Sequence, residues 1–254
     1  MFLVKSCHYK DNVLNSKTIK IGTLIEYRKI ESQQIVDQEE GFYNLSIDIE
    51  KKALSVDTFN LLSSAEHALI KLKCSFKIRG IEPLFNYTVV DFKAVSNIES
   101  LNRFIFCISK LVKHEDSTTL FKDYDSYWFL DFSDKKAFIK SLEKSLFLEV
   151  KKLIDNGEKV FNKENINIKK LRIKSYFQEI IYTDREFKIN NENLRFIKSD
   201  LPEIFKNVKF IKPSRFEKEQ ELRIIFDFYE GNELLAPIKK FIIIPFQDLS
   251  YIQK

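Results

Sequence analysis

Alternating apolar and polar positions dominate the chain and predict a protein built mostly from β-strands. The tract NYTVVDFKAV is typical, because β-branched and aromatic residues favour a pleated sheet. We predict strands at residues 1–7, 18–24, 43–49, 53–59, 73–78, 86–95, 103–110, 171–183, 187–190, 208–212, 220–229 and 238–246. Lys51 and Lys52 are expected to turn 43–49 into 53–59 as a hairpin, and the EGNE segment to turn 220–229 back into 238–246.

Helical spacing is confined to a few segments. The clearest helix is predicted to begin at Ser133 or Asp134 and to end at the Asn156–Gly157 cap. Its apolar stripe consists of Phe138, Leu142, Leu146, Leu153 and Ile154. Residues 60–72, which include His67, and residues 201–207 predict shorter helices, and residues 25–30 predict a helical turn. We therefore predict a single α+β domain over residues 1–254, with mostly antiparallel sheets and a few outer helices.

Composition narrows the chemistry that such a domain can perform. The five glycines are far apart, so neither a G-x-G-x-x-G fingerprint nor a phosphate-binding P-loop is present. The three histidines and three cysteines lack metal-site spacing, and we expect no metal. Carboxylates, Arg, Lys, Tyr and Ser remain as candidate functional groups.

Charge and hydropathy indicate the compartment. A net charge of +5 is compatible with a nucleic-acid or nucleotide partner without requiring one. The start of the chain is charged too early for a signal peptide, and no apolar run approaches the length of a membrane span. Cysteines without evident partners suit a reducing environment, so we expect a cytoplasmic protein that does not enter a membrane.

The segment KPSRFEKEQELRIIFDF, residues 212–228, contains the densest candidate chemistry. If it is extended, one strand face carries Arg215, Glu217, Glu219, Glu221 and Arg223. Crowded carboxylates raise the pKa of at least one member and favour binding of a cation or of ribose hydroxyls. A solvated edge with alternating charge is the alternative interpretation.

Three further segments are candidates. Arg28 and the DQEEG loop at residues 37–41 form a meaningful pair only if they meet in space. The strand RFIFCIS ends in Ser109, whose hydroxyl can bind a ligand. Asp91 and Lys93, at the end of TVVDFK, resemble part of a metal-dependent nuclease site, with Glu82 or Asp57 as a second acid.

The order of these segments resembles a known family. The blocks IGTLIEYRKIE with the following DQEEG, FIFCIS, and KPSRFEKEQELRI resemble an uncharacterised bacterial family found near defence and toxin genes. That family is in turn similar to the ADP-ribosyltransferase fold, whose members include toxins that modify nucleic acids or proteins.

This resemblance implies a role for each matching residue. Glu221 takes the place of the catalytic carboxylate, Glu219 orients the acceptor, and Ser109 lies near the nicotinamide ribose. Arg28 is the expected phosphate-binding residue, with Lys5 or His8 as alternatives, and Tyr127 or Tyr124 is expected to stack on nicotinamide. The implied cosubstrate is NAD.

The implied function is that of a toxin or antiphage effector with a nucleic-acid or protein acceptor and an antitoxin or phage protein as a further partner. Two alternatives remain open: a Mg²⁺-dependent nuclease that uses Asp91 and Lys93, and a non-enzymatic module that binds protein or nucleic acid.

Overall fold

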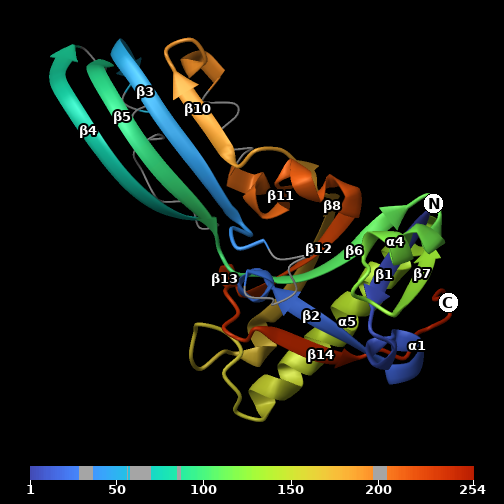
Figure 1. The fold of residues 1–254 in the computed structure, drawn as a ribbon. Coiled ribbons are helices and arrows are strands. Elements are labelled where there is room, and N and C mark those ends of the chain that lie inside the picture. The colour runs from blue at the N-terminus through green and yellow to red at the C-terminus, as the bar shows by residue number, and fades with distance from the viewer. Residues whose placement is uncertain (29–36, 56, 58–69, 85–86, 197–204) are drawn as a thin grey trace. The chain divides into compact units, whose positions relative to one another are not determined.

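The computed structural model describes residues 1–28, 37–55, 57, 70–84, 87–196 and 205–254 (Figure 1). Most of the helix predicted at 60–72, with His67, and most of the helix predicted at 201–207 lie outside these residues. Contacts group the chain into two compact units. Unit 1 consists of residues 1–40, 102–182 and 214–254, and unit 2 of residues 41–101 and 183–213.

Unit 1 is built on an eight-stranded antiparallel sheet. Its strands are β1 (Phe2–Cys7), β2 (Thr18–Thr23), β6 (Phe104–Leu111), β7 (Ser126–Asp131), β8 (Leu171–Glu179), β12 (Glu221–Glu230), β13 (Glu233–Leu235) and β14 (Phe241–Pro245). A two-residue strand, β9 (Ile181–Tyr182), follows β8. The register places β8 along one edge of β12, and β6 followed by β13 along the other.

Strand β6 has two different partners on its second edge. Its first residues, Phe104 and Ile105, pair with β2, and its last residues, from Ser109 onward, pair with β1. Residues 106–108 pair with neither strand in this register, so the sheet divides there. This division creates an opening in the middle of the sheet.

Helices are few in unit 1. They are α1 (Val13–Ser16), α2 (Leu24–Tyr27), α4 (Ser117–Leu120) and α5 (Lys135–Asp155), with short 3₁₀ helices η1 (Tyr9–Asp11), η2 (His114–Asp116), η3 (Phe132–Asp134), η4 (Ile168–Lys170) and η7 (Ser214–Glu219). The predicted long helix is confirmed as α5, and Gly157 after it has a φ of 80°. Glycine suits this cap because other residues adopt a positive φ only with strain.

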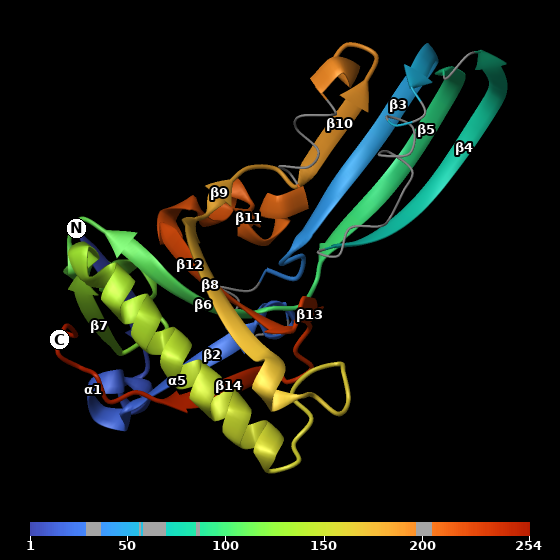
Figure 2. The ribbon, with the colours of Figure 1, turned by 180° about the vertical axis from the view of Figure 1, so that it is seen from behind.

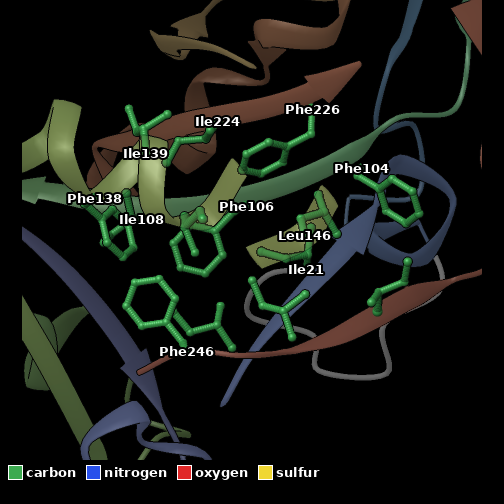
Figure 3. Packing of buried hydrophobic residues seen from close by; sticks show 14 of the residues in the cluster. Ile21, Phe104, Phe106, Ile108, Phe138, Ile139, Leu146, Ile224, Phe226 and Phe246 are labelled. Atoms are coloured by element: carbon green, nitrogen blue, oxygen red, sulfur yellow. The ribbon is translucent and has the colours of Figure 1, made fainter. Parts of the chain in front are cut away.

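The main core lies between α5 and one face of the sheet. Helix α5 contacts β8 and β14 (Figure 2). Figure 3 shows Phe138, Ile139 and Leu146 of α5 among Phe106 of β6 and Ile224 of β12. Because strand side chains alternate, the intervening residues of β6 and β12 face the opposite side of the sheet.

Unit 2 is a four-stranded sheet with the order β10-β3-β5-β4. Its strands are β3 (Phe42–Ser55), β4 (Ile70–Leu84), β5 (Tyr87–Ser100) and β10 (Glu186–Asn190), and it also contains β11 (Ile211–Lys212), η5 (Leu194–Phe196) and η6 (Val208–Phe210). Strand β10 is parallel to β3 and the other pairs are antiparallel. The two units together confirm the predicted class, which is mixed α+β with mostly antiparallel sheets and a few helices.

Two predicted hairpins are wrong. Residues 43–49 and 53–59 were expected to pair with each other, but β3 runs through this region and pairs with β5 on both sides of a bulge after Ile49. Lys51, with a φ of 48°, absorbs the extra residue of the bulge. At EGNE, Gly231 with a φ of 62° turns β12 into β13, whereas β14 pairs with β2. Long-range pairing overrides the local turn signal in both cases.

We expect Phe138→Ala to destabilise the protein by about 3–5 kcal/mol, because it deletes a buried ring and leaves a cavity. The Phe138 ring is fully buried and its centroid lies 5.7 Å from that of Trp128 and 5.8 Å from that of Phe246. The measurement is urea denaturation. Leu148→Ala on the same helix is the control, since Leu148 is 57% exposed, and equal destabilisation by both variants would contradict this description of the core.

Candidate active site

The segment that precedes β12 differs from the prediction. Residues 214–219 form the 3₁₀ helix η7, anchored by the buried side chain of Phe216, instead of a strand. Gln220 has a φ of 43°, and β12 begins only at Glu221. The predicted strand face with five charged residues is therefore wrong. Glu219 lies at the end of η7, and only Glu221 and Arg223 share a face of β12.

Arg223 is held between two carboxylates in the interior of unit 1. Its Nε donates to Oε1 of Glu221 at 2.8 Å, and its Nη1 donates to Oε1 of Glu40 at 2.7 Å. Arg223, Glu40 and Glu221 are 1%, 2% and 5% exposed, respectively. We call these three residues the Arg223 cluster. Burial opposes the charge on Arg223, but the charges of Glu221 and Glu40 outweigh it and raise its pKa further above its usual range.

Arg28 and the DQEEG loop do meet. The Nε of Arg28 donates to the backbone carbonyl of Glu40 at 2.6 Å. The side chain of Arg28 thus supports the loop that carries Glu40, and through it the Arg223 cluster.

Ser109 and Cys107 lie next to this cluster on β6. Ser109 is the register partner of Glu221, and Cys107 is the register partner of Arg223. The thiol of Cys107 is hydrogen-bonded to Glu221 and to Tyr27. A carboxylate can only accept, so the thiol donates to Glu221 and the sulfur accepts from the hydroxyl of Tyr27. A continuous polar chain therefore connects Tyr27, Cys107 and Glu221.

A cavity of about 470 Å³ opens where the sheet divides. This volume lies within the range of small-molecule sites. Its lining residues come from β1, β2, β6, β7, β14, α2, η1 and the turns beside them: Lys5, Ser6, Cys7, His8, Asp11, Thr18, Ile19, Lys20, Gly22, Glu26, Tyr27, Phe106, Tyr124, Trp128, Phe241 and Ile243. We call it the first cavity. Five aromatic residues among them give the cavity apolar surfaces, and two lysines, Lys5 and Lys20, stand against two acidic residues, Asp11 and Glu26.

Gly22 permits the wall formed by Tyr27. A Cβ at position 22 would lie 2.8 Å from Cε2 of Tyr27 and 2.4 Å from Oε2 of Glu26, closer than side chains tolerate. Glu26 is nearly buried and pairs with Lys20 at 2.5 Å. The glycine thus allows the Tyr27 ring to pack against β2, with its hydroxyl bonded to Cys107.

The first cavity brings together some of the predicted ligand-binding residues. Lys5 and His8 line it, and Lys5 Nζ donates to the carbonyl of Cys107 at 2.9 Å, on the unpaired stretch of β6. Tyr124 also lines it, and burial is the main cause of the raised pKa of Tyr124, with Glu219 among the nearby charges that contribute. Arg28 is not one of the lining residues.

Tyr127 lies elsewhere. It is on β7, and its hydroxyl is 3.1 Å from Nδ1 of His114. It lines a second, smaller cavity together with Tyr124. The structure therefore places the two predicted stacking tyrosines at two adjoining hollows of unit 1.

The residues of the nuclease alternative lie in unit 2 and make structural contacts. Asp91 Oδ1 accepts from the backbone N–H of Lys51 at 2.7 Å, at the β3 bulge. Lys93 Nζ pairs with Asp48 at 3.1 Å and with Glu50 at 3.2 Å. Within the described chain, no three His, Cys, Asp or Glu residues gather as they would around a metal ion.

Sequence reasoning missed Glu40 and Tyr27 as partners of Glu221. The acidic DQEEG loop signalled that Glu40 needs a cation, but its partner Arg223 is 183 residues away. Gly22, five positions before Tyr27, indicated that the backbone could approach another group closely. A glycine alone does not show which side chain lies against it.

Comparisons of the chain with protein-family models, with curated proteins and with solved structures find no significant match. Among the described residues, no helix has the length and apolar character needed to cross a membrane. The chemistry of the site must therefore follow from its own geometry.

We expect Arg223→Met to destabilise the protein by about 3–5 kcal/mol, because it leaves two buried carboxylates without their cation. Urea denaturation at pH 7 measures this loss. Part of the loss should be recovered at pH 5, since unpaired buried carboxylates have raised pKa values and become neutral as the pH falls. Arg215→Met, at an exposed arginine of η7, is the control, and equal loss in both variants would contradict the proposed importance of the cluster.

Both described thiols should be unreactive at neutral pH. Burial raises the pKa of Cys107 to about 12 and that of Cys7 to about 11, so the nucleophilic thiolate is scarce. Iodoacetamide at pH 7.5 should leave both unmodified in the folded protein and modify both in urea, as measured by peptide mass spectrometry. Rapid labelling of folded Cys107 would show that the thiol is not held as described.

Proposed function

We propose that the protein is an ADP-ribosyltransferase-like enzyme that cleaves the N-glycosidic bond of NAD. The observation that carries this proposal is the buried Glu221 carboxylate, fixed by Arg223 and joined through Cys107 and Tyr27 to the aromatic first cavity. The ADP-ribosyltransferase-like fold and the toxin or antiphage role are part of the same proposal.

A fixed carboxylate suits this reaction. When the bond between C1′ of the ribose and the nicotinamide nitrogen breaks, the electron pair leaves with nicotinamide, which becomes neutral. Positive charge develops on the ribose, and a nucleophile on the acceptor then bonds to C1′ and loses its proton. A negative charge that is already oriented in a water-poor site stabilises that transition state without reorganisation.

The contacts of Glu221 hold its charge in one place. Arg223 binds one carboxylate oxygen, and Glu40 fixes Arg223 from its other side. Two carboxylates share one guanidinium, so the cluster carries net negative charge. Glu221 is not itself one of the residues that line the first cavity, so its charge acts on the cavity across Cys107 and Tyr27. The low effective dielectric constant of a protein interior strengthens such an effect.

The first cavity offers complementary surfaces for a nicotinamide nucleotide. The rings of Tyr27, Phe106 and Trp128 can bury a flat heterocycle, and Lys5 can neutralise a phosphate. Glu219 is close enough to Tyr124 to affect its pKa, and in this proposal it orients the acceptor and receives its proton. The acceptor in this proposal is a nucleic acid or a protein.

The test is release of nicotinamide from NAD, followed by mass spectrometry, for the wild type and for Glu221→Gln. We expect a rate loss on the order of 100-fold, because glutamine removes the charge from the site. The amide oxygen can still accept from Arg223, so the variant should remain folded, as thermal unfolding will show.

Glu217→Gln is the matched control, since Glu217 is exposed on η7. It should release nicotinamide at the wild-type rate. Equal rates for Glu221→Gln and Glu217→Gln would refute the role of Glu221, and metal-dependent cleavage of RNA or plasmid by a wild type that does not consume NAD would favour the nuclease.

A further inference from the structure

A second cavity of about 270 Å³ adjoins the first one in unit 1. It is formed by β1, α4, the segment before β7, β7 itself and Lys254, and it shares Ser6 and Tyr124 with the first cavity. We propose that this second cavity binds a purine nucleoside, and that the two cavities together hold the two halves of a dinucleotide. The inference rests on the proposed function only in taking NAD to be that dinucleotide.

Two buried hydroxyl groups in this cavity lack partners. Ser117 is 1% exposed, and neither its Oγ nor the buried Oγ of Ser6 makes a hydrogen bond among the described residues. Buried hydroxyls are almost always paired in proteins, because leaving one unpaired sacrifices its hydration without compensation. Both serines are among the residues that line the second cavity, so a small shift of either hydroxyl toward the cavity would bring it to a polar ligand bound there.

The remaining walls suit a flat heterocycle attached to a sugar. Phe121, Tyr124 and Tyr127 supply aromatic surfaces, and such surfaces stack on nucleic-acid bases. The hydroxyl of Tyr127 is already engaged with His114, so this residue offers its ring rather than its polar end.

Asp125 provides the acceptor that a nucleoside needs. Its Oδ1 accepts from the backbone N–H of Tyr9 at 2.7 Å, which orients the carboxylate beside the cavity. A carboxylate has several acceptor positions, so it can also receive ribose hydroxyls or an exocyclic amino group. Lys254 also lines this cavity and can offset the charge of Asp125, so the placement of the phosphates follows from the basic residues of the first cavity.

Size and position support the division into two halves. At about 270 Å³ the second cavity is smaller than the first, at about 470 Å³, so a whole dinucleotide would have to extend over both. A ligand that passes Tyr124 from one cavity to the other meets Lys5 and His8 on the side of the first cavity. Those two basic residues are the expected neighbours of the diphosphate.

Calorimetric titration with AMP, and separately with nicotinamide mononucleotide, tests the assignment. The variant is Thr118→Phe, which fills the second cavity, and the control is Thr119→Phe. Both threonines are exposed on α4 and bond a backbone carbonyl three residues earlier, but only Thr118 lines the cavity. We expect Thr118→Phe to weaken AMP binding at least about tenfold through steric exclusion, more than it weakens the mononucleotide, and Thr119→Phe to change neither.

Ser117→Ala gives a second measurement that is independent of filling the cavity. It should leave thermal stability unchanged or raised, since the hydroxyl has no hydrogen-bond partner in the described part of the chain. It should weaken AMP binding about fivefold through loss of one hydrogen bond. No saturable binding of AMP by the wild type, or equal binding by the two phenylalanine variants, would overturn the inference. AMP binding that depends on Thr118 without nicotinamide release would refute the proposed function and leave the purine site standing.

Discussion

A guanidinium buried at 1% exposure requires hydrogen-bond acceptors and compensating negative charge, and in this protein Arg223 obtains both from carboxylates 2 and 183 residues away. That requirement draws the loop that carries Glu40 onto the polar face of β12. It also fixes the rotamer of Glu221, and with it the positions of Cys107 and Tyr27 beside the first cavity. A buried ion pair is expensive to form, so its value here lies in orientation more than in net stability.

The two faces of the central sheet of unit 1 have different roles. Its apolar face packs against α5 with closely spaced aromatic rings, which supplies the hydrophobic stabilisation of unit 1. Its other face carries the Arg223 cluster and, further along β12, a second buried pair in which Arg103 Nε lies 2.7 Å from Asp227. Because the apolar side chains on one face supply the hydrophobic stabilisation of unit 1, the opposite face can accommodate buried charged groups.

Strand β6 pairs with β2 at its first residues and with β1 at its last residues, and this division places the first cavity beside the polar face. Residues 106–108 lack a paired strand on one edge, and Lys5 caps the carbonyl of Cys107 there. The opening becomes the first cavity, and α4 with the start of β7 forms the second beside it. The proposed cleavage of NAD and the proposed purine site both depend on this interruption of an otherwise regular sheet.

The amino-acid sequence by itself determined the coarse class, most strands and the long helix with its cap, and it singled out Glu221 and the DQEEG loop as candidates. These features depend on periodicity and local residue preferences, which are present within a few neighbouring positions. Tertiary structure alone decided that residues 43–55 form one bulged strand, that β14 pairs with β2, and that η7 removes Glu219 from the strand. It also decided that Arg223 joins Glu40 to Glu221, because contacts between distant segments follow from packing and desolvation, which no local pattern encodes.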